Sequence, residues 1–244
     1  MMIFLLLLGI NPGGHDEIIN KGGAMPEIMV LSTLHQLHGK VKYYTYEDLS
    51  KIIEKFKPDM LAVELRPVDV EKRIEQPVKQ EYQYSVYPLI DKLKCKVVPL
   101  EPSEPKYSEL VELYKKSSEE LQKNNPEALK QFGIYVNALY EVLLNWWSSP
   151  IDVNSSETDR HFEIKHKYQH ALFGKDEERG WELWNQHFLK RILDAASECK
   201  ECRILILVGA EHAYWLRKKL REQKGVKLLN TPRVLEDLLK NNRL

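Results

Sequence analysis

The chain has 244 residues, which suits one large domain or one domain with an insertion. Its 36 Lys and Arg residues balance 36 Asp and Glu residues, which excludes a chain-wide basic field for binding nucleic acid or acidic lipid. Three cysteines, among them one Cys199-x-x-Cys202 pair, make neither a disulfide framework nor a four-ligand zinc site, so a reduced, cytoplasmic location is expected.

The first 24 residues differ in character from the rest of the chain. Residues 1–8 are apolar, but no positive charge precedes them, no small-x-small cleavage site follows, and the run is too short to span a bilayer. Residues 21–24 can be encoded by a stretch that resembles a bacterial ribosome-binding site directly ahead of Met25. We therefore predict that residues 1–24 are a misassigned extension and that residues 25–244 form one domain. The alternative is a membrane-associated or exported protein that keeps residues 1–24.

The N-terminal half of this predicted domain alternates strands and helices. An apolar run that begins at Ile28 predicts a buried strand, and Thr45 with an acid three residues later predicts a capped helix. Two more strands are expected, over residues 60–65 and 96–100, with a helix between them over residues 87–93. This order predicts βαβ units and a parallel sheet with right-handed crossovers.

A long helical stretch interrupts the alternation. Residues 108–196 contain no strand-like run, and breaks at residues 124–126, 148–150 and Gly174 divide them into three or four helices. The alternating pattern then resumes with a strand (residues 203–208), a helix (212–223) and a short strand (226–229). A closing helix, capped by Thr231, begins at residue 231. The predicted fold is an α/β domain with a mostly parallel or mixed central sheet, flanking helices and a helical insertion between the third and fourth strands.

Four of the predicted strands lead into side chains that bind metals or transfer protons. They are followed by His35, Glu64, Glu101 and His212, respectively. In an open α/β sheet, ligands bind beyond the carboxyl ends of the strands. The sequence therefore predicts a functional site at this edge, and the matching contexts of the two histidines favour a metal-binding or catalytic role for both.

The candidate carboxylates each have an alternative interpretation. Glu64 follows an apolar run, so it needs a cation, which can be Arg66, another arginine or a metal ion. Arg66 lies two residues further on and is expected on the same side, so the two side chains can also line one pocket. Glu101 follows a predicted strand, but its surroundings are equally typical of a polar turn. Glu211 is either a favourable first-turn acid of a helix or a general base.

Three further histidines and four tryptophans have predominantly structural interpretations. His38 is interpreted as a surface residue, with a further metal ligand as the alternative. His166 and His170 are spaced i, i+4, but lysines flank them, which favours a solvated helix face. The tryptophans are predicted to pack the core of the insertion, with an aromatic substrate cleft as the alternative; they are Trp146, Trp147, Trp181 and Trp184.

These motifs resemble the TraB/Tiki superfamily, which includes pheromone-shutdown proteins and Wnt-inactivating metalloproteases and, more distantly, erythromycin esterase-like and haem-binding ChaN-like proteins. Gly209-Ala210-Glu211-His212 matches the second of the group's two Gly-x-x-His motifs, and residues 58–66 resemble its "KPD-apolar-VEL" segment. The first motif carries Ser32 where glycine is usual. The group also has an Arg-Asn pair. Asn185 matches its asparagine, but a tryptophan occupies the arginine position. Arg160 is the alternative arginine, although it lies earlier in the chain than the pair is expected.

The resemblance implies a divalent metal ion, manganese, cobalt or zinc, bound by His35, Glu64 and His212. We expect a metal-dependent, peptidase-like hydrolase with a peptide or small-molecule substrate. The ion would acidify a water molecule, Glu211 or Glu101 would act as base, and Arg66 would stabilise the oxyanion. The second hypothesis is a non-catalytic binding or regulatory protein with the same fold, and the third is haem binding through the histidines. We expect no nucleic-acid partner and no stable membrane insertion.

Overall fold

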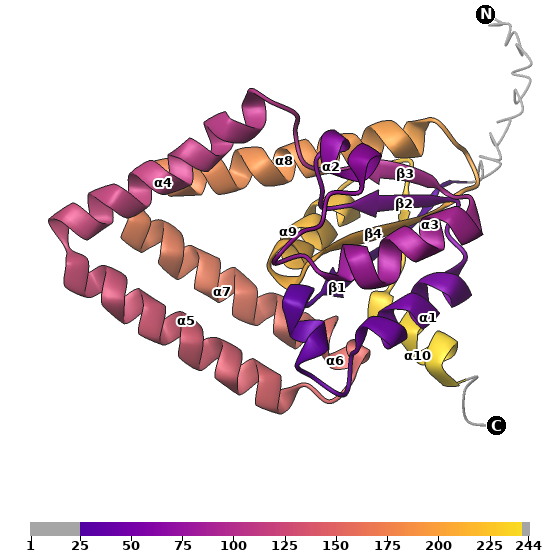
Figure 1. Cartoon of the computed structure of the whole chain (residues 1–244), viewed down its shortest axis with the longest axis horizontal. Helices are drawn as coiled ribbons and strands as arrows, with labels where there is room; N and C mark the ends of the chain where they lie inside the picture. The colour runs from indigo at the N-terminus through magenta and orange to yellow at the C-terminus, as the bar shows by residue number, and fades with distance from the viewer. Residues whose placement is uncertain (1–24, 241–244) are drawn as a thin grey trace, which may run out of the picture.

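The structure is a computed structural model that describes residues 25–240, so the predicted extension over residues 1–24 lies outside it (Figure 1). The five described strands form one parallel sheet in the order β3-β2-β4-β1-β5. They are β1 (Glu27–Thr33), β2 (Met60–Val63), β3 (Lys96–Pro99), β4 (Arg203–Gly209) and β5 (Lys227–Leu228). The α/β prediction is confirmed, and the sheet is parallel rather than mixed.

The register of the three central strands brings distant motifs together. Thr33 at the end of β1 pairs with Gly209 at the end of β4, and Val63 at the end of β2 pairs with Leu207 on the other side of β4. The residues that follow these positions therefore leave the sheet at the same edge. Three segments that lie far apart in the sequence, around residues 35, 64 and 212, meet there.

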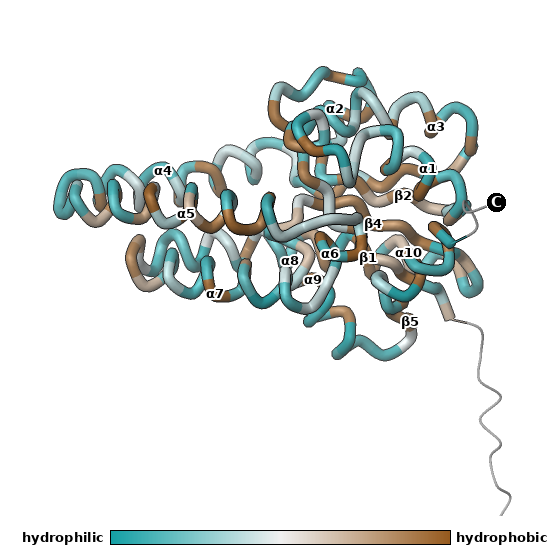
Figure 2. The backbone as a smooth tube through the Cα atoms, turned by 90° about the horizontal axis from the view of Figure 1, so that it is seen from below, coloured by the Kyte–Doolittle hydropathy of each residue, from teal (hydrophilic) through white to brown (hydrophobic). Residues whose placement is uncertain are grey.

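Helices cover both faces of the sheet. The helices α1 (Tyr46–Phe56), α3 (Tyr87–Leu93) and α10 (Thr231–Lys240) pack on one face, with Met29 and Leu31 of β1 among its buried residues. The other face carries Ile28 and Val30 and is covered by α8 (Lys175–Ser197) and α9 (Ala210–Arg221). Successive strand residues point to opposite faces, so a strand covered on both sides is apolar throughout, as Figure 2 shows.

The local helix signals are partly confirmed. Thr45 and Asp48 form the predicted capping box at the start of α1. At α10 the predicted threonine cap is wrong, because Asn230 Oδ1 accepts the Arg233 N–H while the Thr231 hydroxyl donates to the main chain of β1. Three short helical segments lie near the edge that carries the ligand candidates: η1 (His35–Gly39), α2 (Pro67–Lys72) and the π-helical η2 (Tyr82–Val86).

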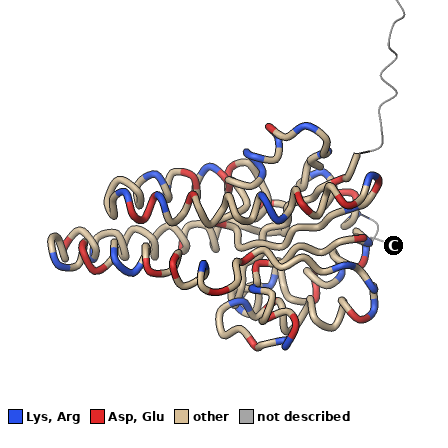
Figure 3. Tube along the Cα trace, turned by 90° about the horizontal axis from the view of Figure 1, so that it is seen from above, with Lys and Arg blue, Asp and Glu red and all other residues tan. Residues whose placement is uncertain are grey.

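The predicted insertion projects from the sheet as a group of long helices (Figure 1). It consists of α4 (Lys106–Asn124), α5 (Pro126–Trp146), the short α6 (Pro150–Val153), α7 (Ser156–Phe173) and α8. The helix breaks fall at the predicted Asn, Ser-Pro and Gly positions. Charges of both signs are interspersed along these helices (Figure 3). At the end of α8, Cys199 pairs with Cys202 in a disulfide ahead of β4.

No helix within residues 25–240 has both the length and the apolar character that are needed to cross a bilayer.

A buried arginine connects the insertion to the sheet. The Arg217 side chain on α9 is 5% exposed and forms an ion pair with Asp159 of α7. Its Nη2 lies 2.9 Å from the Val30 carbonyl oxygen, 3.0 Å from Ser32 Oγ and 2.7 Å from Asn154 Oδ1. Asn154 Oδ1 also accepts the Ser32 N–H at 2.8 Å. The Ser32 hydroxyl therefore accepts a hydrogen bond from Arg217 of α9 that a glycine at this position could not accept.

Replacing this arginine by an apolar residue of similar length tests the connection. We expect Arg217→Met to lower the free energy of unfolding by roughly 3 kcal/mol, because it leaves the carboxylate of Asp159 without its partner in a largely buried position. Urea unfolding followed by circular dichroism measures the change. Arg179→Met, at an exposed arginine of α8, is the matched control and should stay within about 0.5 kcal/mol of the parent. Equal stability of the two variants would contradict this role of Arg217.

Candidate active site

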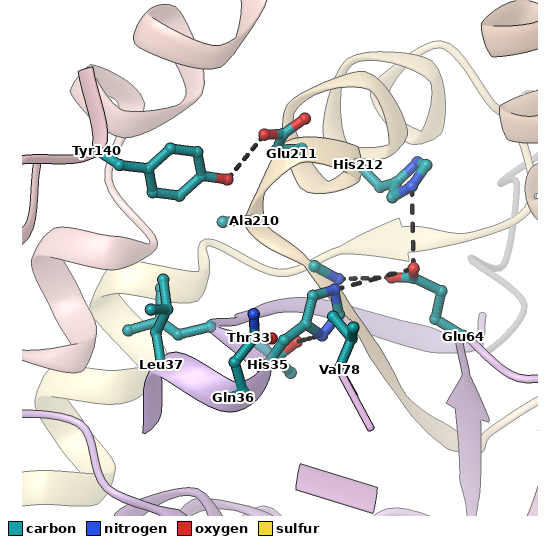
Figure 4. Close-up of a pocket in the computed structure, with 12 residues that line it drawn as sticks. Thr33, His35, Gln36, Leu37, Glu64, Val78, Tyr140, Ala210, Glu211 and His212 are labelled. Atoms are coloured by element: carbon teal, nitrogen blue, oxygen red, sulfur yellow. Dashed lines mark hydrogen bonds and ion pairs between the residues drawn. The ribbon is translucent and has the colours of Figure 1, made fainter. Parts of the chain in front are cut away.

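A pocket of about 400 Å³ opens at the carboxyl edge of the central strands (Figure 4). His35, Glu64, Glu211 and His212 line it, together with Tyr140 from helix α5 of the insertion. The structure thus brings both histidines of the sequence motifs and two of the candidate carboxylates into one cavity. Glu101 and Arg66 are not among the residues that line it.

Both candidate histidines face one carboxylate oxygen of Glu64. Glu64 Oε1 lies 4.0 Å from His35 Nε2 and 3.9 Å from His212 Nε2. The other carboxylate oxygen, Oε2, accepts the N–H of Gly209 at 2.7 Å, which fixes the direction of the group. The side chain is 6% exposed, so its charge is separated from bulk water.

Both imidazoles are oriented through their Nδ1 atoms. His35 Nδ1 lies 2.7 Å from Glu81 Oε1, and His212 Nδ1 lies 2.9 Å from Asn185 Oδ1. The Asn185 amide nitrogen donates to the Trp181 carbonyl, so its oxygen is left to accept a proton from His212. In each neutral ring the Nε2 atom, which faces Glu64, then carries the lone pair.

The two imidazoles differ in their proton affinity. Burial by itself lowers the pKa of His35, but the Glu81 carboxylate and then Glu64 outweigh this effect and raise the pKa above its ordinary value. His212 has an amide instead of a carboxylate on Nδ1, and burial lowers its pKa. His35 therefore holds a proton more strongly than His212 does.

The cation that neutralises Glu64 is a lysine that sequence reasoning missed. Lys79 Nζ lies 3.0 Å from Glu64 Oε1 and 2.6 Å from Glu101 Oε1, and it donates to the Glu64 carbonyl oxygen at 2.8 Å. Burial would raise the pKa of Glu64, but Lys79 and then the two imidazoles lower it to about 2. Arg66, the neighbour in sequence, instead donates two hydrogen bonds to Asp69, at 2.7 and 2.9 Å.

One short segment at the start of η2, residues 79–82, supplies three groups to the site. Besides Lys79, Glu81 accepts from the Thr33 hydroxyl at 2.9 Å as well as binding His35, and the Tyr82 hydroxyl bridges the Glu64 N–H and the Leu207 carbonyl oxygen. This segment joins no strand and has no motif spacing. The sequence pattern contains no feature that would have identified it.

The candidate base Glu211 is held by the insertion. Its carboxylate accepts from Tyr140 of α5 at 2.7 Å and from Lys165 of α7 at 2.7 Å, and it lies 3.1 Å from His166 Nε2. Burial would raise the pKa of Glu211, but His166 and Lys165 hold it well below its usual range. Glu101, the other candidate, has its pKa raised by burial and forms its ion pair with Lys79.

Two histidine interpretations are corrected by burial. His38 is 1% exposed rather than on the surface, and both its ring nitrogens bind main-chain groups, Nε2 the Leu34 N–H and Nδ1 the Tyr44 carbonyl, so neither is left for a metal. His166 is 2% exposed, so its predicted solvated helix face is wrong. Arg160 is exposed on α7 and does not line the pocket.

A tryptophan of the insertion lies between two imidazoles. The Trp181 ring stacks on His212, with 4.7 Å between ring centroids, and on His166, with 3.7 Å between centroids. Trp181 was predicted to pack the insertion's own core. It also fixes the plane of a candidate ligand, so the insertion shapes the site directly.

Gly209 is required by a close approach rather than by its backbone angles. Its φ of −53° and ψ of 144° are accessible to any residue. A Cβ atom at this position would lie 2.6 Å from His35 Nε2 and 3.5 Å from Glu64 Oε2. The glycine at position 209 therefore leaves the space that the imidazole of His35 occupies.

Comparison of the chain with family models, with curated proteins and with solved structures gave no match.

Adding a methyl group at position 209 tests this close approach. We expect Gly209→Ala to displace the His35 ring and lower the free energy of unfolding by roughly 1–3 kcal/mol, because the new carbon overlaps Nε2. Urea unfolding and the ring proton NMR signals of His35 measure the two effects. The control is Gly133→Ala in α5, where nothing lies within 4 Å, and it should raise stability by roughly 0.5–1 kcal/mol. An unshifted His35 signal in Gly209→Ala would contradict the argument.

The buried His166 should make stability depend on pH. Burial lowers its pKa to about 4, against an ordinary value of 6.5, so between these values the unfolded chain binds a proton that the folded chain does not. From pH 7 to pH 5 we expect the parent to lose roughly 2 kcal/mol more stability than His166→Phe, which keeps the stacking on Trp181. Urea unfolding at a series of pH values measures the difference, and parallel pH profiles would contradict it.

Proposed function

We propose that the protein is a metal-dependent hydrolase, peptidase-like, with His35, His212 and Glu64 as the metal ligands. The observation that carries the proposal is the orientation of the two imidazoles. Each binds a protein acceptor through Nδ1 and directs Nε2 at the same carboxylate oxygen. Metal-binding histidines are held in this way, with the second nitrogen bonded to a carboxylate or carbonyl group.

The donor atoms lie close enough for a small side-chain movement to bring them onto one ion. Tetrahedral ligands at about 2.1 Å from an ion lie about 3.4 Å from one another, and the two Nε2–Oε1 distances are 3.9 and 4.0 Å, so the side chains would close by roughly 0.5 Å to hold the ion. Within residues 25–240, no group of three His, Cys, Asp or Glu side chains is already gathered as a metal cluster. Two nitrogens and one carboxylate oxygen suit zinc, cobalt or manganese.

The reaction divides between the ion and the surrounding residues. A bound divalent ion would polarise a substrate carbonyl and acidify water. Glu211 is the candidate carboxylate that lines the pocket, and Lys165 and His166 keep it ionised, so at neutral pH it can accept a hydrogen bond from the attacking water. Tyr140 donates to Glu211 and limits its rotation. These contacts support an orienting role for Glu211 more than that of a strong base, because its pKa is low.

The rest of the lining favours uncharged substrate groups. Leu34, Leu37, Val78 and Ala210 contribute apolar surface to the pocket. A cavity of about 400 Å³ is at the lower end of the range for small-molecule sites, so it suits one or two amino-acid side chains or a small ester or amide. These features support a peptide or small-molecule substrate.

One observation favours the second hypothesis, a non-catalytic binding protein with the same pocket. Lys79 already neutralises Glu64, so the buried carboxylate has a partner without any metal ion. In that case the pocket would bind its ligand through the apolar lining and the polar groups at its base.

Metal content decides between the two functions. We expect about one ion per chain in the parent after incubation with Mn²⁺, Co²⁺ or Zn²⁺ and dialysis, because one set of three ligands is present. His35→Ala and His212→Ala should each lose the ion, and with it the hydrolysis of an apolar peptide mixture, while the control His187→Ala on α8 keeps both. Inductively coupled plasma mass spectrometry measures the ion. A parent without metal, or variants that retain it, would contradict a two-histidine metal site.

A further inference from the structure

The oxygen that would bind a metal ion already contacts a cation. Glu64 Oε1 lies 3.0 Å from Lys79 Nζ and about 1 Å further, at 3.9 and 4.0 Å, from the two imidazole nitrogens. The ammonium group is therefore the nearest charged partner of this oxygen. A divalent ion placed between Glu64 and the histidines would experience repulsion from Lys79 at short range.

Lys79 has two other partners to which it can remain bound. It contacts Glu101 Oε1 at 2.6 Å and the Glu64 carbonyl oxygen at 2.8 Å, and both are shorter than its contact with Glu64 Oε1. Glu101 is buried and does not line the pocket, and the contact with Lys79 is its only ion pair among the described residues. An ammonium group that gives up Glu64 Oε1 thus stays within a short hydrogen bond of a second carboxylate.

Glu64 keeps its orientation without Lys79. Its Oε2 atom accepts the Gly209 N–H at 2.7 Å, and its own N–H donates to the Tyr82 hydroxyl at 2.8 Å. Both contacts are independent of Oε1. Loss of the lysine would therefore remove a positive charge from the site without removing the groups that direct the carboxylate toward the histidines.

We propose that Lys79 is a resident cation of the site, which shares Glu64 Oε1 with the incoming metal ion and thereby sets its affinity. When the ion binds, Lys79 gives up this oxygen and stays on Glu101 and on the Glu64 carbonyl group. The inference rests on the proposed function, because it concerns the same ligand oxygen. It makes Lys79 a positioning residue that acts on the metal through Glu64, and it makes Glu101 the group that receives the displaced charge.

Calorimetric titration of the full chain with Mn²⁺, Co²⁺ and Zn²⁺ tests the proposal without an activity measurement. Lys79→Met should bind the ion roughly ten- to a hundredfold more tightly than the parent, because a positive charge a few ångströms from the ion is removed. Lys92→Met, at an exposed lysine paired with Glu54, is the matched control and should leave the dissociation constant unchanged.

A second variant tests the same idea with the opposite sign. Glu101→Gln leaves Lys79 without its shortest carboxylate contact, so the ammonium should hold Glu64 Oε1 more firmly and the metal should bind roughly tenfold more weakly. Glu104→Gln, at a carboxylate that is 55% exposed, is its control. This variant also decides the question if Lys79→Met, which leaves two buried carboxylates unpaired, does not fold.

The outcomes separate this inference from the proposed function. Tighter metal binding in Lys79→Met or weaker metal binding in Glu101→Gln supports the inference, provided that the dissociation constants of the two control variants are unchanged. A parent that binds metal with an affinity that neither variant changes would overturn the inference and leave the metal site intact. A parent that binds no metal, together with a Lys79→Met variant that does, would support the resident cation and overturn the metal-dependent function. Absence of binding in every variant would overturn both.

Discussion

The burial of one carboxylate, that of Glu64, constrains the rest of this structure. An ionised carboxylate that is removed from water without partners costs several kcal/mol or shifts its pKa. Here it stays charged because Gly209 donates its N–H, Lys79 supplies an ammonium group and two imidazoles face it. Gly209 and His212 come from one segment, where β4 leads into α9, and His35 follows β1, so the parallel register of β1, β2 and β4 is what brings these groups to Glu64.

The helical insertion completes the site instead of only extending the fold. Asn185 and Trp181 of α8 hold His212 by a hydrogen bond and by stacking, and Lys165 of α7 and Tyr140 of α5 hold Glu211. Three of its long helices therefore contact residues that line the pocket. Arg217 adds a connection from α9 to the start of α7 and to β1, so a displacement of the insertion would be transmitted to the strand that precedes His35.

The fold was predictable because its signals are local. Branched apolar runs, a capping box at Thr45 and Ser-Pro or Gly breaks each act over a few residues, and the structure has elements at those positions. The convergence of His35, Glu64 and His212 followed from one topological rule, that residues after parallel strands share an edge. Asn185 was named from the family resemblance, and the structure places it on His212.

The remainder of the site depends on tertiary contacts that have no sequence pattern. Lys79 and Glu81 lie in an irregular segment, and only the folded chain shows that they, and not Arg66, bind the buried groups. His38 and His166 looked solvated because their neighbours are polar, yet packing of distant elements buries both. The role of Gly209 likewise depends on a tertiary contact, because its lack of a side chain makes room for the imidazole of His35.

The most direct test of the account is an anomalous-scattering crystal structure of the full chain grown with Zn²⁺ or Co²⁺. We expect one anomalous peak at about 2.0–2.3 Å from His35 Nε2, His212 Nε2 and Glu64 Oε1, with the Lys79 ammonium bound to Glu101. No peak at this position, with Lys79 still bound to Glu64 Oε1, would contradict the metal site and show that the lysine is the only cation that this carboxylate binds.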